Sequence, residues 1–473
     1  MSAQDQQPAS LYAAREPIFP RRVSGRFRTL KWWIMAVTLG IYYITPWIRW
    51  DRGPHLPDQA VLVDMAGRRF FFFWIEIWPH EFYFVAGLLI MAGLGLFLFT
   101  SALGRVWCGY ACPQTVWTDL FILVERWVEG DRNARVRLWN QGWDLRKLRL
   151  RLVKWALWLL IALATGGAWV FYFTDAPTLA RDILTLSAHP VVWITIAILT
   201  LTTFFFGGFF REQICIYACP WPRIQAAMMD EDTLTVAYRD WRGEPRGKLK
   251  STAPRGDCID CRACVNVCPM GIDIRDGQQL ACITCALCID ACDEVMDKVG
   301  QPRGLIGYLA LSDEVAEKAG RPPRPVWKHV LRPRTMLYTV LWAGIGIGLI
   351  VALFVRSDIG VSVSPVRNPT FVTLSDGSIR NTYDVRIRNQ QGEDRVFTLS
   401  YSADAPFVMT LEGEEGHETV VPADSQKLQR LYITAPAGTP AATMAMTDLR
   451  IWVTAPDGAG RVHADTLFNG KSE

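Results

Sequence analysis

Cysteine is the residue type whose spacing carries chemistry in this chain. All twelve cysteines of the 473 residues lie between Cys108 and Cys292. Eight of them form two runs that each read C-x2-C-x2-C-x3-C. The first run consists of Cys258, Cys261, Cys264 and Cys268, and the second consists of Cys282, Cys285, Cys288 and Cys292. A tight loop that supplies three thiolates, joined by a fourth from further away, is the ligand pattern of a 4Fe-4S cluster.

The fourth cysteine of each run is expected to cross to the other cluster, as it does in two-cluster ferredoxins. One predicted cluster therefore uses Cys258, Cys261, Cys264 and Cys292, and the other uses Cys282, Cys285, Cys288 and Cys268. Zinc is the alternative metal, but zinc sites usually take two C-x2-C pairs separated by a longer stretch. Three cysteines at the present spacing do not make a tidy tetrahedron, so the pattern favours iron–sulfur chemistry.

The remaining four cysteines form two C-x3-C-P pairs. Cys108 and Cys112 lie in WCGYACPQ, and Cys215 and Cys219 lie in ICIYACPWP. If these segments are helical, residues four apart share a face at about 5–6 Å, and two thiolates there can hold one soft ion. Thiolates favour Cu(I), zinc or iron–sulfur chemistry. The alternative is a pair of small buried residues before a helix-breaking proline, but the recurrence of the motif favours a functional pair.

Five apolar stretches are long enough to cross a bilayer, which needs about 20 residues. They lie near residues 31-50, 82-104, 153-173, 191-210 and 335-355. The C-x3-C-P pairs follow the second and the fourth stretch, as in a tandem repeat of two spans and one motif. We therefore expect a polytopic α-helical membrane protein in contact with lipid, with an amphipathic segment over 114-130 lying along the interface.

Lysine and arginine in the short loops predict the orientation of the chain. The N-terminal tail and the segment 105-154 are rich in both residues, whereas 174-190 holds only Arg181. This positive-inside pattern predicts a bacterial inner-membrane protein with its N-terminus and the loop 211-334 in the cytoplasm. Thiols stay reduced in that compartment, so metal ligation or redox work is expected and a disulfide framework is not. The net charge of +4 is too small to argue for nucleic acid as a partner.

The chain divides into five expected parts. These are a cytoplasmic tail at 1-30, a four-span domain at 31-220, a cytoplasmic ferredoxin-like domain at 221-334, a fifth span at 335-355 and a periplasmic domain at 360-473. The last part alternates in short runs with turn signals about every 8–12 residues, which is typical of an immunoglobulin-like β-sandwich.

Two further groups of residues could contact a metal. The first comprises Glu76, His80 and Glu81 in the loop 51-81, which could also meet a quinol or simply anchor the chain at the interface. The second comprises Met409, Met444 and Met446. Methionines two apart on a strand share a face and could touch Cu(I), although methionine usually just packs. The lone histidines His189 and His329 are expected to be structural.

The whole pattern resembles the cytochrome c oxidase accessory proteins of the CcoG family, also called FixG or RdxA. The resemblance rests on the paired spans that each end in C-x3-C-P, the double ferredoxin run, the fifth span and a cysteine-free C-terminal sandwich domain. It implies a cupric reductase that converts Cu(II) to Cu(I) in the cytoplasm. It also implies, as partners, a copper-transporting P-type ATPase and the assembly factors of cbb-type oxidases. Copper would then be the substrate of Cys108, Cys112, Cys215 and Cys219, and the other eight cysteines would bind the two 4Fe-4S clusters.

Two other interpretations remain open at this point. A quinol dehydrogenase of the NapH type shares four spans, the C-x3-C-P pairs and ferredoxin runs, but residues 335-473 count against it. A non-enzymatic scaffold for oxidase assembly would use the clusters only to stabilise its fold. No G-x-G-x-x-G fingerprint follows a strand, so a nucleotide bound by this chain is not expected, and the electron donor is either a soluble reductase or the quinol pool. The sequence leaves open whether the chain forms a homo-oligomer.

Overall fold

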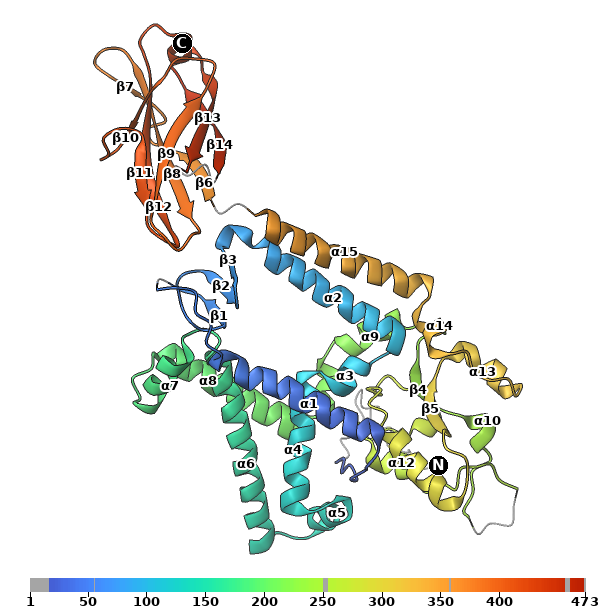
Figure 1. Cartoon of the computed structure of the whole chain (residues 1–473). Helices are drawn as coiled ribbons and strands as arrows, with labels where there is room; N and C mark the ends of the chain where they lie inside the picture. The colour runs from blue at the N-terminus through green and yellow to red at the C-terminus, as the bar shows by residue number, and fades with distance from the viewer. Residues whose placement is uncertain (1–16, 55, 250–253, 357–358, 456–459, 472–473) are drawn as a thin grey trace, which may run out of the picture. The chain divides into compact units, whose positions relative to one another are not determined.

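The structure is a computed structural model that describes residues 17–54, 56–249, 254–356, 359–455 and 460–471. The chain forms two compact units. The first unit joins residues 1–49 to 59–349, and the second joins 50–58 to 350–473. The first contains the cysteines and the helices α1 to α14, and the second contains the strands β6 to β14 (Figure 1).

Among the described residues, four helices are long and apolar enough to cross a membrane, so the chain is a membrane protein. They are Pro79–Leu103, Leu145–Val170, Pro190–Phe210 and Pro333–Val355. In the first, a 3-10 turn (Pro79–Glu81) leads into α2 (Tyr83–Leu103), and in the third, α8 (Pro190–Phe205) continues as a π-helix (Phe206–Phe210). The other two are α6 (Leu145–Val170) and α15 (Pro333–Val355). These helices agree with the second to fifth predicted spans, although α6 begins earlier than expected.

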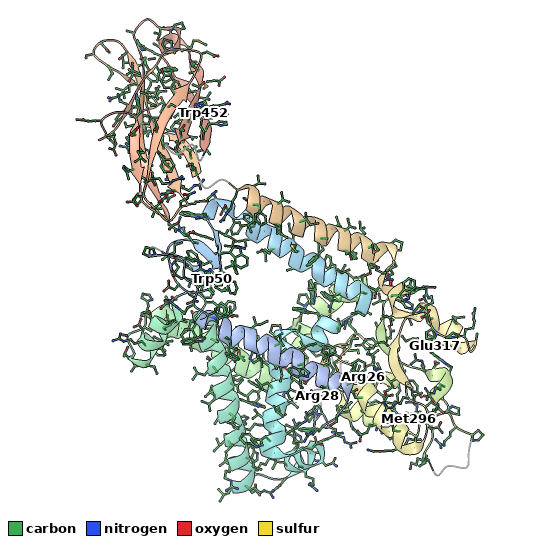
Figure 2. The ribbon with its side chains drawn as sticks, viewed as in Figure 1. Arg26, Arg28, Trp50, Met296, Glu317 and Trp452 are labelled. Carbon is green, nitrogen blue, oxygen red and sulfur yellow. The ribbon has the colours of Figure 1, made fainter. Side chains whose placement is uncertain are left out.

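The first predicted span, 31-50, forms a helix that is not among these four apolar helices. This helix, α1 (Arg26–Ile44), begins before the predicted stretch and ends before Thr45. Arg28 and Lys31 in its first half are buried, and their side chains lie 2.9 Å and 3.8 Å from the carboxylate of Asp119. The charged start of α1, where Figure 2 labels Arg26 and Arg28, is therefore paired with α4 (Pro113–Glu129). The basic residues at this end lower the mean hydropathy of α1.

Glycines allow the long helices to approach one another closely. A Cβ on Gly87 of α2 would lie 2.6 Å from the Leu349 side chain of α15. A Cβ on Gly166 of α6 would lie 2.8 Å from the Thr200 hydroxyl of α8. Small residues at such contacts are typical of helix pairs in membranes, where close backbone approach supplies the packing energy.

Short elements connect the long helices of the first unit. Before α8 they are β1 (Val61–Asp64), β2 (Arg69–Phe72), β3 (Ile75–Ile77), α3 (Val106–Tyr110), α5 (Arg132–Asn140) and α7 (Ala176–Leu184). After α8 they include α9 (Trp221–Met228), α10 (Asp240–Gly243), α13 (Leu311–Lys318) and α14 (Val326–Val330). His189 caps α8 by accepting a bond from the Val191 amide at 3.3 Å, and His329 lies 2.7 Å from Asp313. Each histidine therefore has a protein partner.

The two ferredoxin runs lie between β4 (Thr235–Tyr238) and β5 (Ile306–Leu309), which pair as an antiparallel sheet. Within the runs, α11 (Ala263–Val267) packs against α12 (Leu287–Val299). Asp290 of α12 accepts bonds from the backbone amides of Phe27 and Arg28 at 3.3 Å and 2.8 Å. A Cβ on Gly25 would lie 2.3 Å from the Asp290 carboxyl carbon, so glycine is needed where the ferredoxin region meets the start of α1.

The second unit is a β-sandwich. One sheet has the order β10-β12-β8-β6, with β7 paired to β8, and the other has the order β11-β9-β13-β14. The strands are β6 (Ile359–Pro365), β7 (Val372–Thr373), β8 (Ile379–Asn389), β9 (Arg395–Ser402), β10 (Val408–Leu411), β11 (Glu418–Val421), β12 (Ser425–Ala435), β13 (Met446–Thr454) and β14 (Arg461–Asn469), with a short helix α16 (Pro440–Thr443). Alternate residues such as Val385, Phe397 and Ile451 are fully buried between the sheets, as a two-sheet core requires. This confirms the predicted sandwich.

Candidate functional site

The two ferredoxin runs fold into equivalent loops. In the first run, Asp260 and Arg262 have φ angles of 51° and 55°. In the second run, Thr284 and Ala286 have φ angles of 53° and 60°. Both pairs stand at the same distance from the first cysteine of their run, so the two loops share one backbone bend. Positive φ is uncommon for residues other than glycine and is typical of functional loops held by their surroundings.

Cysteines of both runs line a small apolar cavity. It brings Cys268 of the first run together with Cys282, Cys285 and Cys288 of the second, with Cys264 beside them. Apolar side chains complete the wall, namely Met270, Ile272, Ile274, Ile283 and Leu287. Four thiols in a dry shell fit the donor set of a 4Fe-4S cluster. The thiols brought together here include the set predicted for the second cluster.

Cys292 lies among the thiols of the first run. Burial raises the pKa of Cys292 to about 12, and so do the neighbouring thiols of Cys264, Cys261 and Cys258. Burial and the nearby thiols of the second run likewise raise the pKa of Cys268 to about 12. Each fourth cysteine therefore has the cysteines of the opposite run as neighbours. The charge of bound iron is what would stabilise such buried sulfurs as thiolates.

The four C-x3-C-P cysteines come together around one cavity of about 330 Å³, which we call the thiol cavity. Its lining includes Cys108, Cys112, Cys215 and Cys219, with apolar residues such as Trp107, Ile214, Trp221 and Ile283. Among the described residues, no three His, Cys, Asp or Glu side chains are close enough to hold a single metal ion. The two motifs, which are far apart in sequence, thus contribute their cysteines to one cavity.

The expectation that each cysteine pair shares one helix face is wrong. Cys108 lies in α3, but Cys112 follows the end of that helix with φ −59° and ψ 127°. Cys215 lies in a π-helix (Ile214–Ala218), and Cys219 follows it with φ −78° and ψ 122°. Both second cysteines precede a proline, whose ring pushes the preceding residue out of the helical region. The proline of each motif therefore ends the helix, so that the second cysteine has an extended backbone and does not share a helix face with the first.

The thiol cavity rests directly on the second ferredoxin loop. A Cβ on Gly109 would lie 2.6 Å from the Ile283 carbonyl oxygen and 3.0 Å from the Cys285 backbone. The Tyr110 hydroxyl donates to the Cys285 carbonyl at 3.1 Å. Ile283 lines both the thiol cavity and the cavity of the ferredoxin cysteines. The two groups of sulfurs therefore lie in neighbouring cavities that share the Ile283 side chain.

Two polar residues that the sequence did not single out support this contact. Arg105 donates to the carbonyls of Leu280, Cys282 (3.4 Å) and Pro222 (2.6 Å), and so ties the end of α2 to the ferredoxin loop. Gln225 accepts a bond from the Cys108 thiol at 3.2 Å. Burial raises the pKa of Cys108 to about 12, although Arg105 and Gln225 oppose the shift. Cys108 is therefore a neutral thiol until a cation replaces its proton.

Within the described part of the chain, the other candidate residues are not grouped closely enough to hold a metal ion. Glu76 pairs with Arg69 at 3.0 Å, Glu81 accepts from the Trp78 amide at 3.0 Å, and His80 is exposed. Of the methionines, Met409 is buried in β10, Met446 is exposed at the start of β13, and Met444 precedes that strand. The expectation that Met444 and Met446 share a strand face is therefore wrong.

Profiles of three protein families match the chain. The profile described as a 4Fe-4S dicluster domain matches residues 210–310, and a 4Fe-4S binding domain matches 84–130. The profile described as an IG-like fold at the C-terminal of FixG matches 349–471. These ranges cover the ferredoxin runs, the first C-x3-C-P motif and the β-sandwich.

Three curated relatives match nearly the whole length of the chain. Protein RdxB of Cereibacter sphaeroides is 73% identical and covers 100% of both chains. The chain belongs to the FixG/RdxA family. Protein RdxA of the same organism is 67% identical over 97% of this chain and 98% of its own. The nitrogen fixation protein FixG of Rhizobium meliloti is 54% identical over 90% of this chain and 88% of its own. The FixG/RdxA membership and the 4Fe-4S profiles identify a membrane-bound iron–sulfur electron-transfer protein.

Proposed function

We propose that this FixG/RdxA protein reduces Cu(II) to Cu(I) in the cytoplasm for the assembly of cbb-type cytochrome c oxidase. The thiol cavity is the observation that carries the proposal, because it places four soft ligands against the second ferredoxin loop. Thiolates bind Cu(I) more strongly than harder ligands do, so such a site favours the reduced ion. The apolar wall adds to this preference, because a monocation is less costly to bury than a dication.

The electron balance of the proposed step is simple. One electron passes from a reduced 4Fe-4S cluster to one Cu(II), which becomes Cu(I). The clusters, when bound on their eight cysteines, supply this one-electron chemistry. Cys108, Cys112, Cys215 and Cys219 close around the copper as it binds, since in the structure no three of the described His, Cys, Asp or Glu side chains are close enough to hold one ion. Gln225 orients the Cys108 sulfur. A soluble reductase or the quinol pool returns the electron, and a copper-transporting P-type ATPase together with oxidase assembly factors receives the Cu(I).

The proposed orientation places the protein in the bacterial inner membrane with five spans, α1 included. The ferredoxin region then lies in the cytoplasm and the β-sandwich in the periplasm. The distribution of lysine and arginine supports this topology. Reporter fusions after residues 180 and 400 are expected to read outside, and a fusion near residue 300 is expected to read inside. An outside reading near residue 300 would overturn the cytoplasmic copper reaction.

The two rival interpretations, a quinol dehydrogenase and a non-enzymatic scaffold, can be distinguished by different observations. Membership of the FixG/RdxA family and the FixG profile over 349–471 weigh against a quinol dehydrogenase of the NapH type. A non-enzymatic scaffold would not pass electrons to copper. Reduced protein that Cu(II) fails to reoxidise would therefore favour the scaffold.

The decisive experiment follows the bleaching of the reduced clusters in a stopped-flow instrument. Full-length protein is reduced with dithionite, freed of excess reductant and mixed with Cu(II). The double variant Cys108→Ala, Cys112→Ala is expected to keep its iron and to react at least ~10-fold more slowly, because half of the soft ligands are gone. The double variant Cys215→Ala, Cys219→Ala should behave in the same way.

The matched control is Leu96→Ala, Ile214→Ala, which changes the same cavity wall without removing a thiol. Its rate is expected to stay close to that of the unmodified protein. If a cysteine variant kept both its iron and the full rate, the thiol cavity would not be the copper site.

A further inference from the structure

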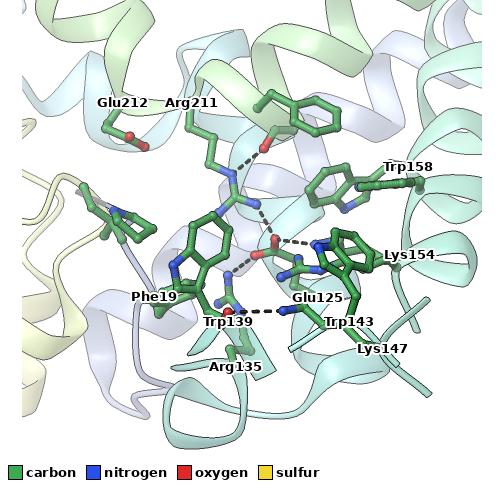
Figure 3. Close-up of a pocket in the computed structure, with 16 residues that line it drawn as sticks. Phe19, Glu125, Arg135, Trp139, Trp143, Lys147, Lys154, Trp158, Arg211 and Glu212 are labelled. Atoms are coloured by element: carbon green, nitrogen blue, oxygen red, sulfur yellow. Dashed lines mark hydrogen bonds and ion pairs between the residues drawn. The ribbon is translucent and has the colours of Figure 1, made fainter. Parts of the chain in front are cut away.

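A second cavity, of about 490 Å³, lies among α4, α5 and α6, and its wall continues along the π-helix Phe206–Phe210 and residues 17–19 (Figure 3). We call it the cationic cavity. It shares no lining residue with the thiol cavity. The proposed copper reaction therefore makes no use of it.

The lining of the cationic cavity carries excess positive charge. Its basic side chains are Arg135, Lys147, Arg151, Lys154 and Arg211. Figure 3 shows Arg135, Lys154 and Arg211 converging on Glu125, with which all three form ion pairs. Glu129 lies behind the lining and pairs with Arg151 and Lys154 at 3.0 Å and 2.9 Å. Counting Glu212 of the lining and Glu129, three carboxylates accompany five cations in a largely buried region.

Glu125 is a charged carboxylate and already has its partners. Although burial alone would raise its pKa, Arg211, Arg135 and Lys154 hold the pKa of Glu125 at about 2. It therefore neutralises only part of the positive charge around it. The cations left in excess need another counter-ion, because a buried charge without one is costly.

Two hydrogen-bond donors show where such a counter-ion would bind. Arg135 is 1% exposed, and its Nη1 atom has no hydrogen-bond partner among the residues that the structure describes. The Lys147 ammonium donates to the backbone carbonyls of Trp139 and Gln141 and forms no ion pair within the described part of the chain. Because an ammonium has three N–H donors, Lys147 keeps one for a ligand. Both side chains line the cavity (Figure 3).

The rest of the wall is mostly aromatic and lies beside a membrane helix. Its aromatic residues are Phe19, Trp139, Trp143, Trp155, Trp158 and Phe209, and Pro17, Ile18 and Gly208 complete it. Trp143 is 70% exposed and Leu145, at the start of α6, is 85% exposed. Exposed tryptophan at the end of a membrane helix is typical of the lipid headgroup region. The cavity therefore combines buried cations with an apolar surface that lipid can reach.

We propose that the cationic cavity binds the phosphate group of an anionic phospholipid. Guanidinium groups match phosphate oxygens in geometry, and a lysine adds a point charge. Basic pockets between membrane helices are known to take anionic headgroups. Inorganic phosphate offers the same charge, but it would leave the aromatic wall without a partner. A lipid satisfies the donors with its headgroup and the tryptophans with its glycerol and acyl chains.

Native mass spectrometry of the full chain in detergent tests this proposal. The probes are phosphatidylglycerol, phosphatidylcholine and inorganic phosphate. We expect one phosphatidylglycerol to be retained at least ~10-fold more strongly than phosphatidylcholine, which corresponds to about 1.4 kcal/mol. Inorganic phosphate at millimolar concentration should not displace it. Equal retention of the two lipids, or displacement by phosphate, would overturn the lipid assignment.

The matched variants are Lys147→Gln and Arg149→Gln. Both remove one positive charge from α6, but Lys147 lines the cavity whereas Arg149 is exposed outside it. Lys147→Gln should weaken phosphatidylglycerol retention about fivefold, as removal of one positive charge near an anionic lipid predicts. Arg149→Gln should leave it unchanged, and an equal loss in both variants would refute a specific site.

Iron content and thermal stability check that the variants fold. A lipid that binds only the folded protein raises the midpoint of unfolding, so phosphatidylglycerol should stabilise the unmodified protein more than phosphatidylcholine does. This comparison tests the proposal even if Lys147→Gln fails to fold, and equal stabilisation by both lipids would contradict it.

Discussion

The thiol cavity and the cationic cavity belong to the same compact unit and differ in the chemistry of their walls. The thiol cavity is lined by the sulfur groups of four cysteines and by apolar side chains, together with Arg105. The cationic cavity is lined by five basic side chains arranged around Glu125. The first suits a soft cation that displaces protons, and the second suits an anion that needs no proton transfer.

The difference also lies in what holds each cavity together. The thiol cavity is built from backbone contacts, since Gly109 and Tyr110 meet the carbonyls of the second ferredoxin loop. The cationic cavity is built from ion pairs whose members are 1–11% exposed. Removing a neutral thiol leaves a small gap, whereas removing a buried carboxylate leaves several unbalanced charges. Substitutions should therefore act very differently in the two places.

The largest effect on stability is expected from Glu125→Gln. This change leaves Arg135, Arg211 and Lys154 without their shared carboxylate, and breaking such a buried pair costs about 3–5 kcal/mol. The midpoint of thermal unfolding should fall clearly. Glu294→Gln is the control, because Glu294 pairs with Lys298 on the surface and such a pair contributes about 0.3–0.5 kcal/mol. Equal shifts in the two variants would show that the cationic cavity does not depend on Glu125.

The functional residues of the thiol cavity could be predicted from the sequence because they are cysteines in a repeated motif. The residues of the cationic cavity could not be predicted. Run spacing, apolar length and strand alternation are local patterns, so the 4Fe-4S domains, four membrane helices and the β-sandwich could be predicted. The acids of α4 could not, because the sequence shows only an amphipathic stretch. The structure turns Asp119, Glu125 and Glu129 inward to meet arginines and lysines from other elements. The partners of a buried charge depend on tertiary contacts that sequence spacing does not encode.

The contact between the thiol cavity and the ferredoxin loop was hidden for the same reason. Nothing in WCGYACPQ indicates that Gly109 touches Ile283, which lies more than one hundred residues away. The proline after each second cysteine is visible in the sequence. Its effect on the preceding residue places that cysteine outside the helix, contrary to the expected helical pair. Gln225 gave no signal at all, since it belongs to no motif.

The predicted cluster of the second run can be disrupted by a substitution at Cys268, which does not line the thiol cavity. Cys268→Ser should lower the iron content from roughly eight to roughly four per chain, because Cys268 is predicted to complete the cluster of the second run. Cys292→Ser should likewise remove the iron of the other cluster, which it is predicted to complete. Iron and sulfide analysis with electron paramagnetic resonance of the reduced protein would show which signal is lost. If Cys268→Ser removed the signal that depends on Cys258, the crossing of ligands would be wrong.

Gly109→Ala tests the contact between the first C-x3-C-P motif and the second ferredoxin loop without removing a cysteine. The new Cβ would stand 2.6 Å from the Ile283 carbonyl, so the loop that carries Cys108 must shift away from the ferredoxin loop. Overpacking of this kind costs about 1–3 kcal/mol, and copper-driven reoxidation should slow several-fold while the iron content holds. Gly142→Ala is the control, because a Cβ there meets no atom within 4 Å. An unchanged rate in Gly109→Ala would show that electron transfer does not depend on this contact.

The smallest effect is expected at the tyrosine that both C-x3-C-P motifs share. Tyr110 is 4% exposed and donates to the Cys285 carbonyl, whereas Tyr217, at the same position of the second motif, is 40% exposed. Tyr110→Phe removes one buried hydrogen bond, which contributes about 0.5–1.5 kcal/mol. Tyr217→Phe, at an exposed position, should change stability by no more than ~0.5 kcal/mol. The measurement is the thermal midpoint of each variant with its iron content verified. Equal midpoints would mean that the two motifs are supported in the same way, and the first would lose its special contact with the ferredoxin loop.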